Sequence, residues 1–185
     1  MSAFYRLADM LGSGIDQAAE AITQGRETVQ GLRASAQESN DLASAIRTLG
    51  EEIAASETAT RSVGFRVNVE GTTRPMHPIV RDEIYRIAGE ALRNAFRHSR
   101  GTQIEVELRY DELQLRLRVR DDGRGIDEKV LADQGREGHF GLRGMRERAA
   151  LIGGKLTLWS ALDAGTELDL SVPASRAYAR IRPVT

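Results

Sequence analysis

The chain has 185 residues, of which 41% are hydrophobic and 29% are charged, and its formal net charge is −1. A chain of this size forms one domain, or one domain with an appendage, and buries a core without cross-links. The balanced charge argues against nucleic acid and membrane surfaces as partners, and the absence of cysteine excludes disulfides and thiolate metal sites. Because no apolar stretch approaches the roughly 20 residues of a membrane span, we expect a cytoplasmic protein.

Residues 1–36 carry a helical pattern in which apolar positions alternate between steps of four and three. This spacing is typical of the seam of a coiled coil or helix bundle. A single amphipathic helix that lies on its own domain is the alternative, but such a long seam exceeds what one docked helix needs. Because the chain supplies few partner helices, we predict self-association through this segment. The seam consists of Phe4, Ala8, Leu11, Ile15, Ala18, Ile22, Gly25, Val29 and Leu32.

Residues 37–63 are predicted to be a connecting helix and a linker. Asn40 or Asp41 can cap the helix, and residues 55–62 are expected to form a loop. The helix carries apolar residues at helical spacing, namely Leu42, Ile46, Leu49 and Ile53.

Residues 64–174 alternate between strand and helix patterns and are predicted to form the second domain. Antiparallel hairpins with helices on one face indicate an α+β fold, a two-layer α/β sandwich. Residues 175–185 show no clear pattern and are taken as a C-terminal tail. The predicted elements, in chain order, are a strand at 64–71, a helix at 79–98, strands at 102–110 and 113–123 joined at Asp111–Glu112, a helix from Leu142 to Gly153–Gly154, and strands on either side of a turn near 163–165.

The predicted helix at 79–98 carries a polar stripe of Glu90, Asn94, Arg97 and His98. Glu90 and Asn94 are four residues apart, so they project from one side of the helix beside its apolar face. An amide oxygen is a hard neutral ligand that suits Mg²⁺ shared with phosphates, and a glutamate one turn away can accept a proton. On its own, such a stripe is more typical of a solvated helix face.

Two short segments at the ends of predicted strands add to this stripe. Asp121, Gly123 and Gly125 follow a strand directly. The glycines let the backbone turn sharply and a flat ligand approach, and an ionised Asp121 can accept a hydrogen bond from an exocyclic amine. Gly165 and Thr166 begin the last strand, where a hydroxyl is placed to bond an adenine ring or a water. Ordinary turns are the alternative for both segments.

A glycine-bearing segment lies between them and is predicted to become a helix at Leu142–Met145. A helix start offers free N–H groups and a positive dipole end to phosphate, and Arg143 and Arg146 would add charge there. A plain flexible loop is the alternative. The glycines recur every three residues, at Gly135, Gly138, Gly141 and Gly144.

As an ordered set, these segments resemble the N, G1 and G2 boxes of the GHKL ATPase superfamily, whose members include sensor histidine kinases, Hsp90, DNA gyrase B and MutL. The set is Glu-x-x-x-Asn on a helix, Asp-x-Gly-x-Gly 27 residues after the Asn, a Gly-x-x-Gly flap and a late Gly-Thr. The stretches EALRNAFRHS and GLRGMRERAALIGGKL are most similar to the nitrate/nitrite-sensor and DesK-like branch of the histidine kinases. The resemblance covers roughly residues 60–174.

The resemblance implies a Bergerat-type ATP-binding fold and roles for residues at matching positions. Asn94 would ligate Mg²⁺ that bridges the ATP phosphates, Glu90 would be the base-like catalytic residue, and Asp121 would hold the adenine amino group. Further ATP contacts would come from Arg97 and His98 near the phosphates, Gly123 and Gly125 at the adenine floor, Thr166 at the adenine end, and the lid residues Gly141, Leu142, Arg143, Gly144 and Met145.

Kinases of this branch phosphorylate a histidine in the first helix of a dimerisation hairpin, and residues 12–36 look like the second helix of that hairpin. The chain's histidines are His77, His98 and His139, none of which lies in 1–36. We therefore expect the acceptor histidine to be absent from this chain and autophosphorylation in isolation to be slight. The resemblance also implies a homodimer through the N-terminal helix, a NarL/LuxR-type response regulator as partner, and a parent protein anchored in a membrane through a missing N-terminal part.

Two other hypotheses remain from the sequence. The chain would be a GHKL ATP-binding regulatory module, or an anti-sigma-type serine kinase, if it binds ATP without phosphorylating a histidine. It would be a helical interaction protein with an α/β scaffold if it binds no ATP.

Overall fold

The computed structural model describes residues 41–57, 63–126 and 140–179. All described residues belong to one compact unit, residues 40–185. The predicted seam helix at 1–36 and most of the glycine-bearing flap, 127–139, lie outside the described residues. The elements are α2 (Leu42–Glu57), β1 (Gly64–Gly71), α3 (Pro78–His98), β2 (Gln103–Tyr110), β3 (Gln114–Asp121), α5 (Phe140–Leu151), β4 (Lys155–Ser160), β5 (Thr166–Pro173) and α6 (Ala174–Ala177).

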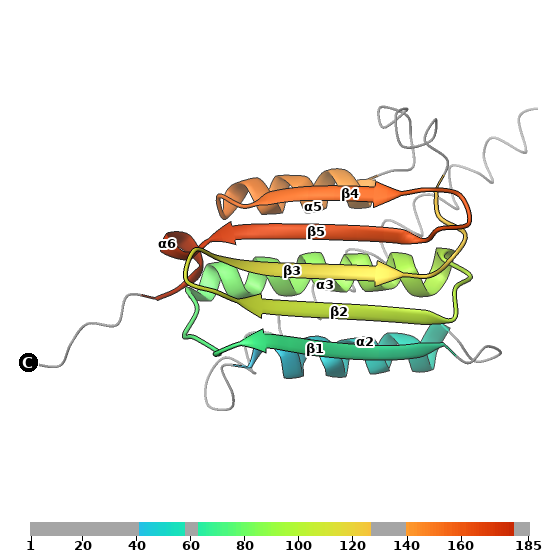
Figure 1. Cartoon of the computed structure of the whole chain (residues 1–185), viewed down its shortest axis with the longest axis horizontal. Coiled ribbons are helices and arrows are strands. Elements are labelled where there is room, and N and C mark those ends of the chain that lie inside the picture. The colour runs from blue at the N-terminus through green and yellow to red at the C-terminus, as the bar shows by residue number, and fades with distance from the viewer. Residues whose placement is uncertain (1–40, 58–62, 127–139, 180–185) are drawn as a thin grey trace, which may run out of the picture. The chain divides into compact units, whose positions relative to one another are not determined.

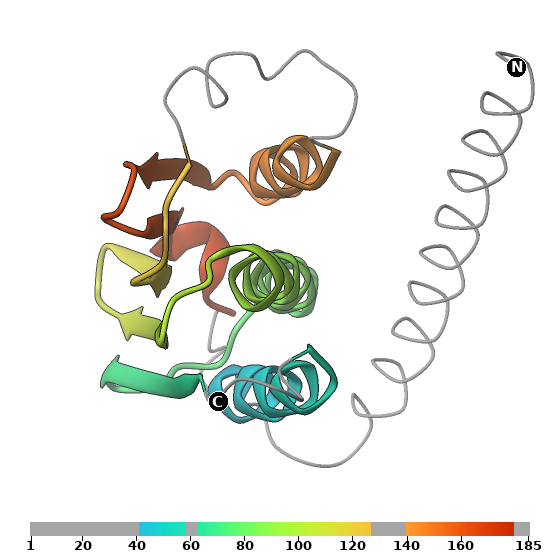
Figure 2. The ribbon, with the colours of Figure 1, turned by 90° about the vertical axis from the view of Figure 1, so that its right-hand side faces the viewer.

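Five strands form one sheet in the order β1-β2-β3-β5-β4 (Figure 1). β1 pairs with β2 in parallel, and the remaining pairs are antiparallel. The long helices α2, α3 and α5 all lie on one face of the sheet, as the edge-on view in Figure 2 shows. The predicted α+β, two-layer sandwich is therefore confirmed, with both hairpins at the expected turns.

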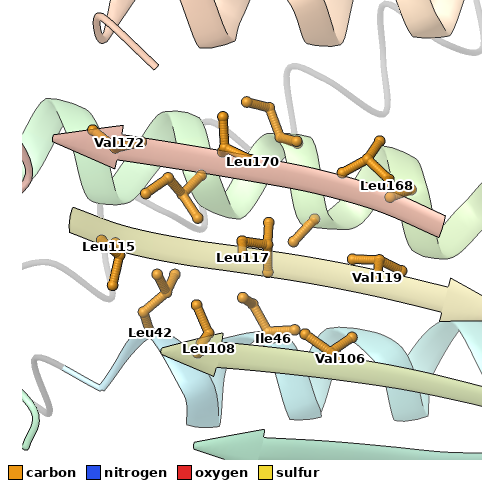
Figure 3. Packing of buried hydrophobic residues seen from close by; sticks show 14 of the residues in the cluster. Leu42, Ile46, Val106, Leu108, Leu115, Leu117, Val119, Leu168, Leu170 and Val172 are labelled. Carbon is orange, nitrogen blue, oxygen red and sulfur yellow. The ribbon is translucent and has the colours of Figure 1, made fainter. Parts of the chain in front are cut away.

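The core lies between the sheet and this helix layer. Alternate residues of β2, β3 and β5 are buried, as expected for strands with one face against helices. The inward side chains meet apolar residues of α2 and α3, so burial of the amphipathic faces holds the two layers together. Figure 3 shows this packing for Val106 and Leu108 of β2, Leu115, Leu117 and Val119 of β3, Leu168, Leu170 and Val172 of β5, and Leu42 and Ile46 of α2.

Helix α2 is an integral part of this core, although the sequence suggested only a connecting segment. The Asp41 carboxylate caps it by accepting the Ala43 N–H at 3.2 Å, as predicted. Leu42, Ile46 and Ile53 are buried, the last at 7% exposure. The expected loop at 55–62 begins later than predicted, because the helix continues to Glu57.

Residues after Pro173 also join the core, where the sequence showed no pattern. Ala177 and Tyr178 are buried. The Ala177 carbonyl accepts the N–H of His77, and Tyr178 forms a β-bridge with Met76, so this segment covers the start of α3. A helix of four residues is too short to show a helical period, which is why the sequence did not reveal it.

No helix in the described part of the chain is both long and apolar enough to span a bilayer.

Candidate functional site

Three polar residues form a row across the end of the sheet. The strand register pairs Asp121 of β3 with Thr166 of β5, and Thr166 with Ser160 of β4. Paired residues on neighbouring strands project to the same face, so the three side chains lie side by side on the face that the helices cover. Asp121 is only 6% exposed, whereas Thr166 and Ser160 are half-buried.

Asp121 is a buried carboxylate that backbone donors hold in place. The N–H of Gly123 donates to its Oδ1 at 2.9 Å, and the backbone of Thr166 also bonds it. Burial raises the pKa of Asp121 above its ordinary value, and the two backbone hydrogen bonds partly offset this rise. A carboxylate with few solvent contacts is suited to accept a hydrogen bond from a ligand amine.

The glycine loop after Asp121 passes close to other backbone segments. Gly125 has a φ of +65°, in the left-handed region, and a Cβ there would overlap the Ala161 carbonyl. A Cβ at Gly123 would likewise overlap the Ser99 carbonyl. The N–H of Arg124 donates to that same Ser99 carbonyl at 2.8 Å, so the loop is fastened to the end of α3.

Two residues that support the loop were missed by sequence reasoning. Asp122 accepts the N–H groups of Thr102 and Gln103 at 2.7 and 2.8 Å, and its second oxygen accepts the Thr102 hydroxyl. Ser160 contacts the Ile126 N–H and the start of β5. Asp122 was visible only as the neighbour of Asp121, and Ser160 became apparent only through the strand register.

The polar stripe of α3 lies at the same end of the molecule as Asp121. The α3 end is fixed there by the bond from Arg124 to Ser99, and Figure 1 shows the end of β3, the start of β5, the end of α3 and the start of α5 together at one side. Asn94 is exposed, and within the described part of the chain its amide makes no hydrogen bond. The amide is therefore available to a ligand.

Glu90 connects α3 to the first turn of α5. Its Oε1 lies directly against the backbone of Gly141, where a Cβ would overlap it, and its other oxygen pairs with Arg93 at 3.3 Å. The structure thus brings together two predicted site residues that are 51 positions apart in the sequence. Farther along the two helices, Arg148 of α5 pairs with Glu83 of α3 at 3.0 Å.

Arg97 and His98 occupy the last turn of α3 and are both exposed. Arg97 bonds Glu57 at the end of α2, with a shortest distance of 2.7 Å. The hydrogen bond from Arg97 lowers the pKa of Glu57, with smaller contributions from the charges of Arg97 and His98. Arg97 therefore contacts the end of α2.

The predicted lid residues of α5 differ in their surroundings. Met145 is buried in the core. Leu142 is half-buried and packs against the same hydrophobic core. Arg143 is exposed and pairs with Glu147 at 2.9 Å. A Cβ at Gly144 would meet no described atom within 4 Å.

The described residues fit a magnesium ion that is shared with a nucleotide and has one protein ligand. The described segments hold no group of three or more histidine, aspartate or glutamate side chains able to bind a metal. The exposed amide of Asn94 can supply one oxygen ligand, which suits Mg²⁺ that keeps its waters and shares phosphate oxygens with a nucleotide.

Comparisons with known proteins identify the family of this fold. The sequence model of the family described as histidine kinase-, DNA gyrase B-, and HSP90-like ATPase matches residues 79–176. Over 99 residues, the chain is 39% identical to sensor protein VraS of Staphylococcus saprophyticus and 38% identical to VraS of Staphylococcus aureus (strain COL). Each alignment covers 52% of this chain and 27% of the relative, so the chain spans about a quarter of these relatives' length.

Two solved structures show the same fold. The blue-light activated histidine kinase of Erythrobacter litoralis EL346 has a TM-score of 0.58 at 26% identity, over 73% of this chain and 42% of that chain. The histidine kinase domain of the same protein has a TM-score of 0.57 at 27% identity, over 77% of this chain and 67% of that chain.

The fold and the family match define an ATP-binding domain of the GHKL type, as the sequence predicted. Since the family match covers just over half of the chain, the chain belongs to the histidine kinase-, DNA gyrase B- and HSP90-like ATPase family. Its similarity to VraS and to the Erythrobacter kinase places it with the ATP-binding catalytic regions of sensor histidine kinases.

Proposed function

We propose that this chain supplies the ATP-binding half of a two-component phosphotransfer reaction. The γ-phosphorus of ATP is attacked by an imidazole nitrogen of an acceptor histidine, an N–P bond forms, and the bond to the β-phosphate oxygen breaks to release ADP. Such transfer depends on positioning and on neutralising phosphate charge. The acceptor lies outside this chain, in the first helix of a dimerisation hairpin.

One observation carries the proposal. The buried carboxylate of Asp121 ends β3 at the same side of the fold as the end of α3. The last turns of α3 carry Asn94, whose exposed amide has no hydrogen-bond partner among the described residues. Glu90, one turn before Asn94, touches the first turn of α5 at Gly141. An amine acceptor, a magnesium ligand and a helix start are the groups that a Mg²⁺-nucleotide requires at its base and at its phosphates.

We assign the remaining predicted residues to this nucleotide. Asp121 takes the adenine amine, with Gly123, Gly125 and Thr166 around the base, and Asn94 takes the Mg²⁺. Glu90 accepts the imidazole proton during transfer. The phosphates lie near Arg97, His98 and the lid residues Gly141, Leu142, Arg143, Gly144 and Met145.

The partners are inferred from the resemblance to sensor histidine kinases. We propose a homodimer of the full-length protein through the segment at 1–36, a NarL/LuxR-type response regulator as the phosphate recipient, and a cytoplasmic location for this region of a membrane-anchored parent. The similarity to VraS, a sensor protein, supports a two-component role.

Isothermal titration with ATP tests the binding site. We expect Mg²⁺-dependent ATP binding by the chain, loss of the Mg²⁺ dependence in Asn94→Ala, and a roughly ten- to hundredfold loss of affinity in Asp121→Asn, because a charge-assisted hydrogen bond is lost. If both variants bind Mg-ATP as well as the parent, the site assignment is wrong.

Phosphotransfer is tested by adding a hairpin fragment that contains the acceptor histidine of a VraS-like kinase. Transfer of the ³²P label from γ-³²P-ATP to that fragment, in an acid-labile form and only when Glu90 and Asn94 are intact, is the expected result. ATP binding without labelling of the fragment would favour the regulatory module, and acid-stable labelling of a protein serine would favour the anti-sigma-type kinase.

A further inference from the structure

Ser160, the last residue of β4, makes three hydrogen bonds beside the site. The N–H of Ile126 donates to its Oγ at 2.8 Å. The same Oγ lies 2.9 Å from the Gly165 carbonyl and 2.9 Å from Thr166 Oγ1. These bonds join the glycine loop after Asp121 to the hairpin that begins β5.

The number of protons available determines the direction of each bond. A serine hydroxyl has one proton and two lone pairs, and the Ile126 N–H occupies one lone pair. The Gly165 carbonyl carries no proton, so its contact with Ser160 needs the Ser160 proton. The contact between Ser160 and Thr166 therefore needs the Thr166 proton, since two oxygens without a proton between them repel each other at 2.9 Å.

The Thr166 hydroxyl is consequently held with its proton turned toward Ser160. Its two lone pairs are the hydrogen-bonding capacity that it can offer to a ligand. Thr166 is the cross-strand neighbour of Asp121, whose ionised carboxylate is also an acceptor only. Of the residues that the structure describes at this edge, Asp121 and Thr166 thus present side-chain acceptors to a ligand.

We propose that Ser160 is a positioning residue of the nucleotide site. By taking the Thr166 proton, it keeps Thr166 as a second acceptor beside Asp121, so that this edge favours a ligand ring that carries an amine. The inference rests on the proposed function, because it requires a nucleotide base to lie against Asp121.

The test compares two ligands that differ only in the amine, ATP and purine riboside 5′-triphosphate, by isothermal titration with Mg²⁺. The parent is expected to prefer ATP. In Ser160→Ala the Thr166 proton is released, and the preference for ATP should fall roughly two- to tenfold, the worth of one neutral hydrogen bond. A merely structural role would weaken both ligands by the same factor, and an unchanged preference in Ser160→Ala overturns the inference.

Three further variants sharpen the test. Ser160→Thr retains the hydroxyl and should restore the preference. Thr166→Val should lower it as Ser160→Ala does, and combining the two should lower it no further, since both act through one bond. Thr157→Ala removes a hydroxyl from the exposed face of the same strand and should leave the preference unchanged.

If Ser160→Ala does not fold, Thr166→Val tests the role of Ser160 instead. This variant leaves the bonds of Ser160 to Ile126 and Gly165 in place. A full preference for ATP in Thr166→Val, or an equal loss in Thr157→Ala, would overturn the role of Ser160. A parent chain that binds neither triphosphate would instead overturn the proposed function itself.

Discussion

At the end of β3, two adjacent carboxylates have different surroundings. Asp121 faces the helix layer and is buried, and burial raises its pKa. Asp122 is exposed and accepts three hydrogen bonds at the start of β2. Burial alone would raise the pKa of Asp122, but the donors of Gln103 and Thr102 outweigh it and lower that pKa below its ordinary value. One carboxylate is thus suited to a ligand and the other to holding two segments together.

We predict that Asp122→Asn destabilises the fold in a pH-dependent manner. A depressed folded-state pKa adds stability that is present above the ordinary carboxyl pKa of about 3.9 and is lost as the pH falls through the folded-state value. In urea unfolding, the free energy of unfolding of Asp122→Asn should therefore be lower than that of the parent by about 1 kcal/mol at pH 7. This difference should become smaller below about pH 4.

The matching measurement on Asp121→Asn provides the control. A raised folded-state pKa adds stability that is present below the unfolded value and is lost as the pH rises through the folded value. The free energy of unfolding of the parent relative to Asp121→Asn should accordingly fall as the pH rises, which is the opposite of the trend for Asp122→Asn. If the two variants show the same pH trend, the assigned surroundings of these carboxylates are wrong.

At the scale of elements, α2 packs closely against β1 at Gly50. A Cβ at Gly50 would overlap the ring of Phe65, which also lies 5.9 Å from the ring of Phe96 on α3. Glycine at this point lets α2 approach the sheet, and the ion pair between Glu57 and Arg97 fastens its far end to α3. The helix that precedes β1 thus touches the last turn of the proposed nucleotide helix.

We predict opposite effects of one substitution in two helices. Gly50→Ala should lower the free energy of unfolding by about 1–3 kcal/mol, because the methyl group overpacks a rigid aromatic ring. Gly144→Ala on α5 meets no described atom within 4 Å and should raise it by up to about 1 kcal/mol through helix propensity. Chemical denaturation of both variants is the check, and equal effects would contradict the packing of α2.

At the scale of the whole molecule, the compact unit extends beyond the family match at 79–176. β1 pairs with β2 along eight residues, and α2 contributes Leu42 and Ile46 to the core. At the other end, Tyr178 bridges to Met76. Residues outside the matched region therefore add the edge strand β1 to the sheet and complete the hydrophobic core.

We predict that a fragment of residues 78–176 does not unfold cooperatively, whereas residues 40–179 do. Removing β1 and α2 exposes the edge of β2 and the side chains that α2 covers, and each buried aliphatic side chain contributes about 1.5–3 kcal/mol. Thermal denaturation followed by circular dichroism compares the two fragments. A sharp transition of the shorter fragment would show that α2 and β1 are dispensable.

Much of this protein follows from the sequence alone. Alternating and helical periods indicated all five strands and the three long helices, and both hairpin turns lie where Asp and Gly residues predicted them. The order of Glu90–Asn94, Asp121-x-Gly-x-Gly and Gly165–Thr166 indicated an ATP-binding domain of the GHKL type. These features are local in sequence, because period and turn chemistry act over a few residues.

The tertiary structure alone decided which of these residues meet. Only the strand register places Ser160 beside Thr166 and Asp121, and only helix packing brings Glu90 against Gly141. The membership of α2 and α6 in the core is of the same kind, since an amphipathic pattern marks a face to be buried without naming its partner. Proximity across the sheet depends on pairing between distant segments, and no local pattern in the chain encodes that pairing.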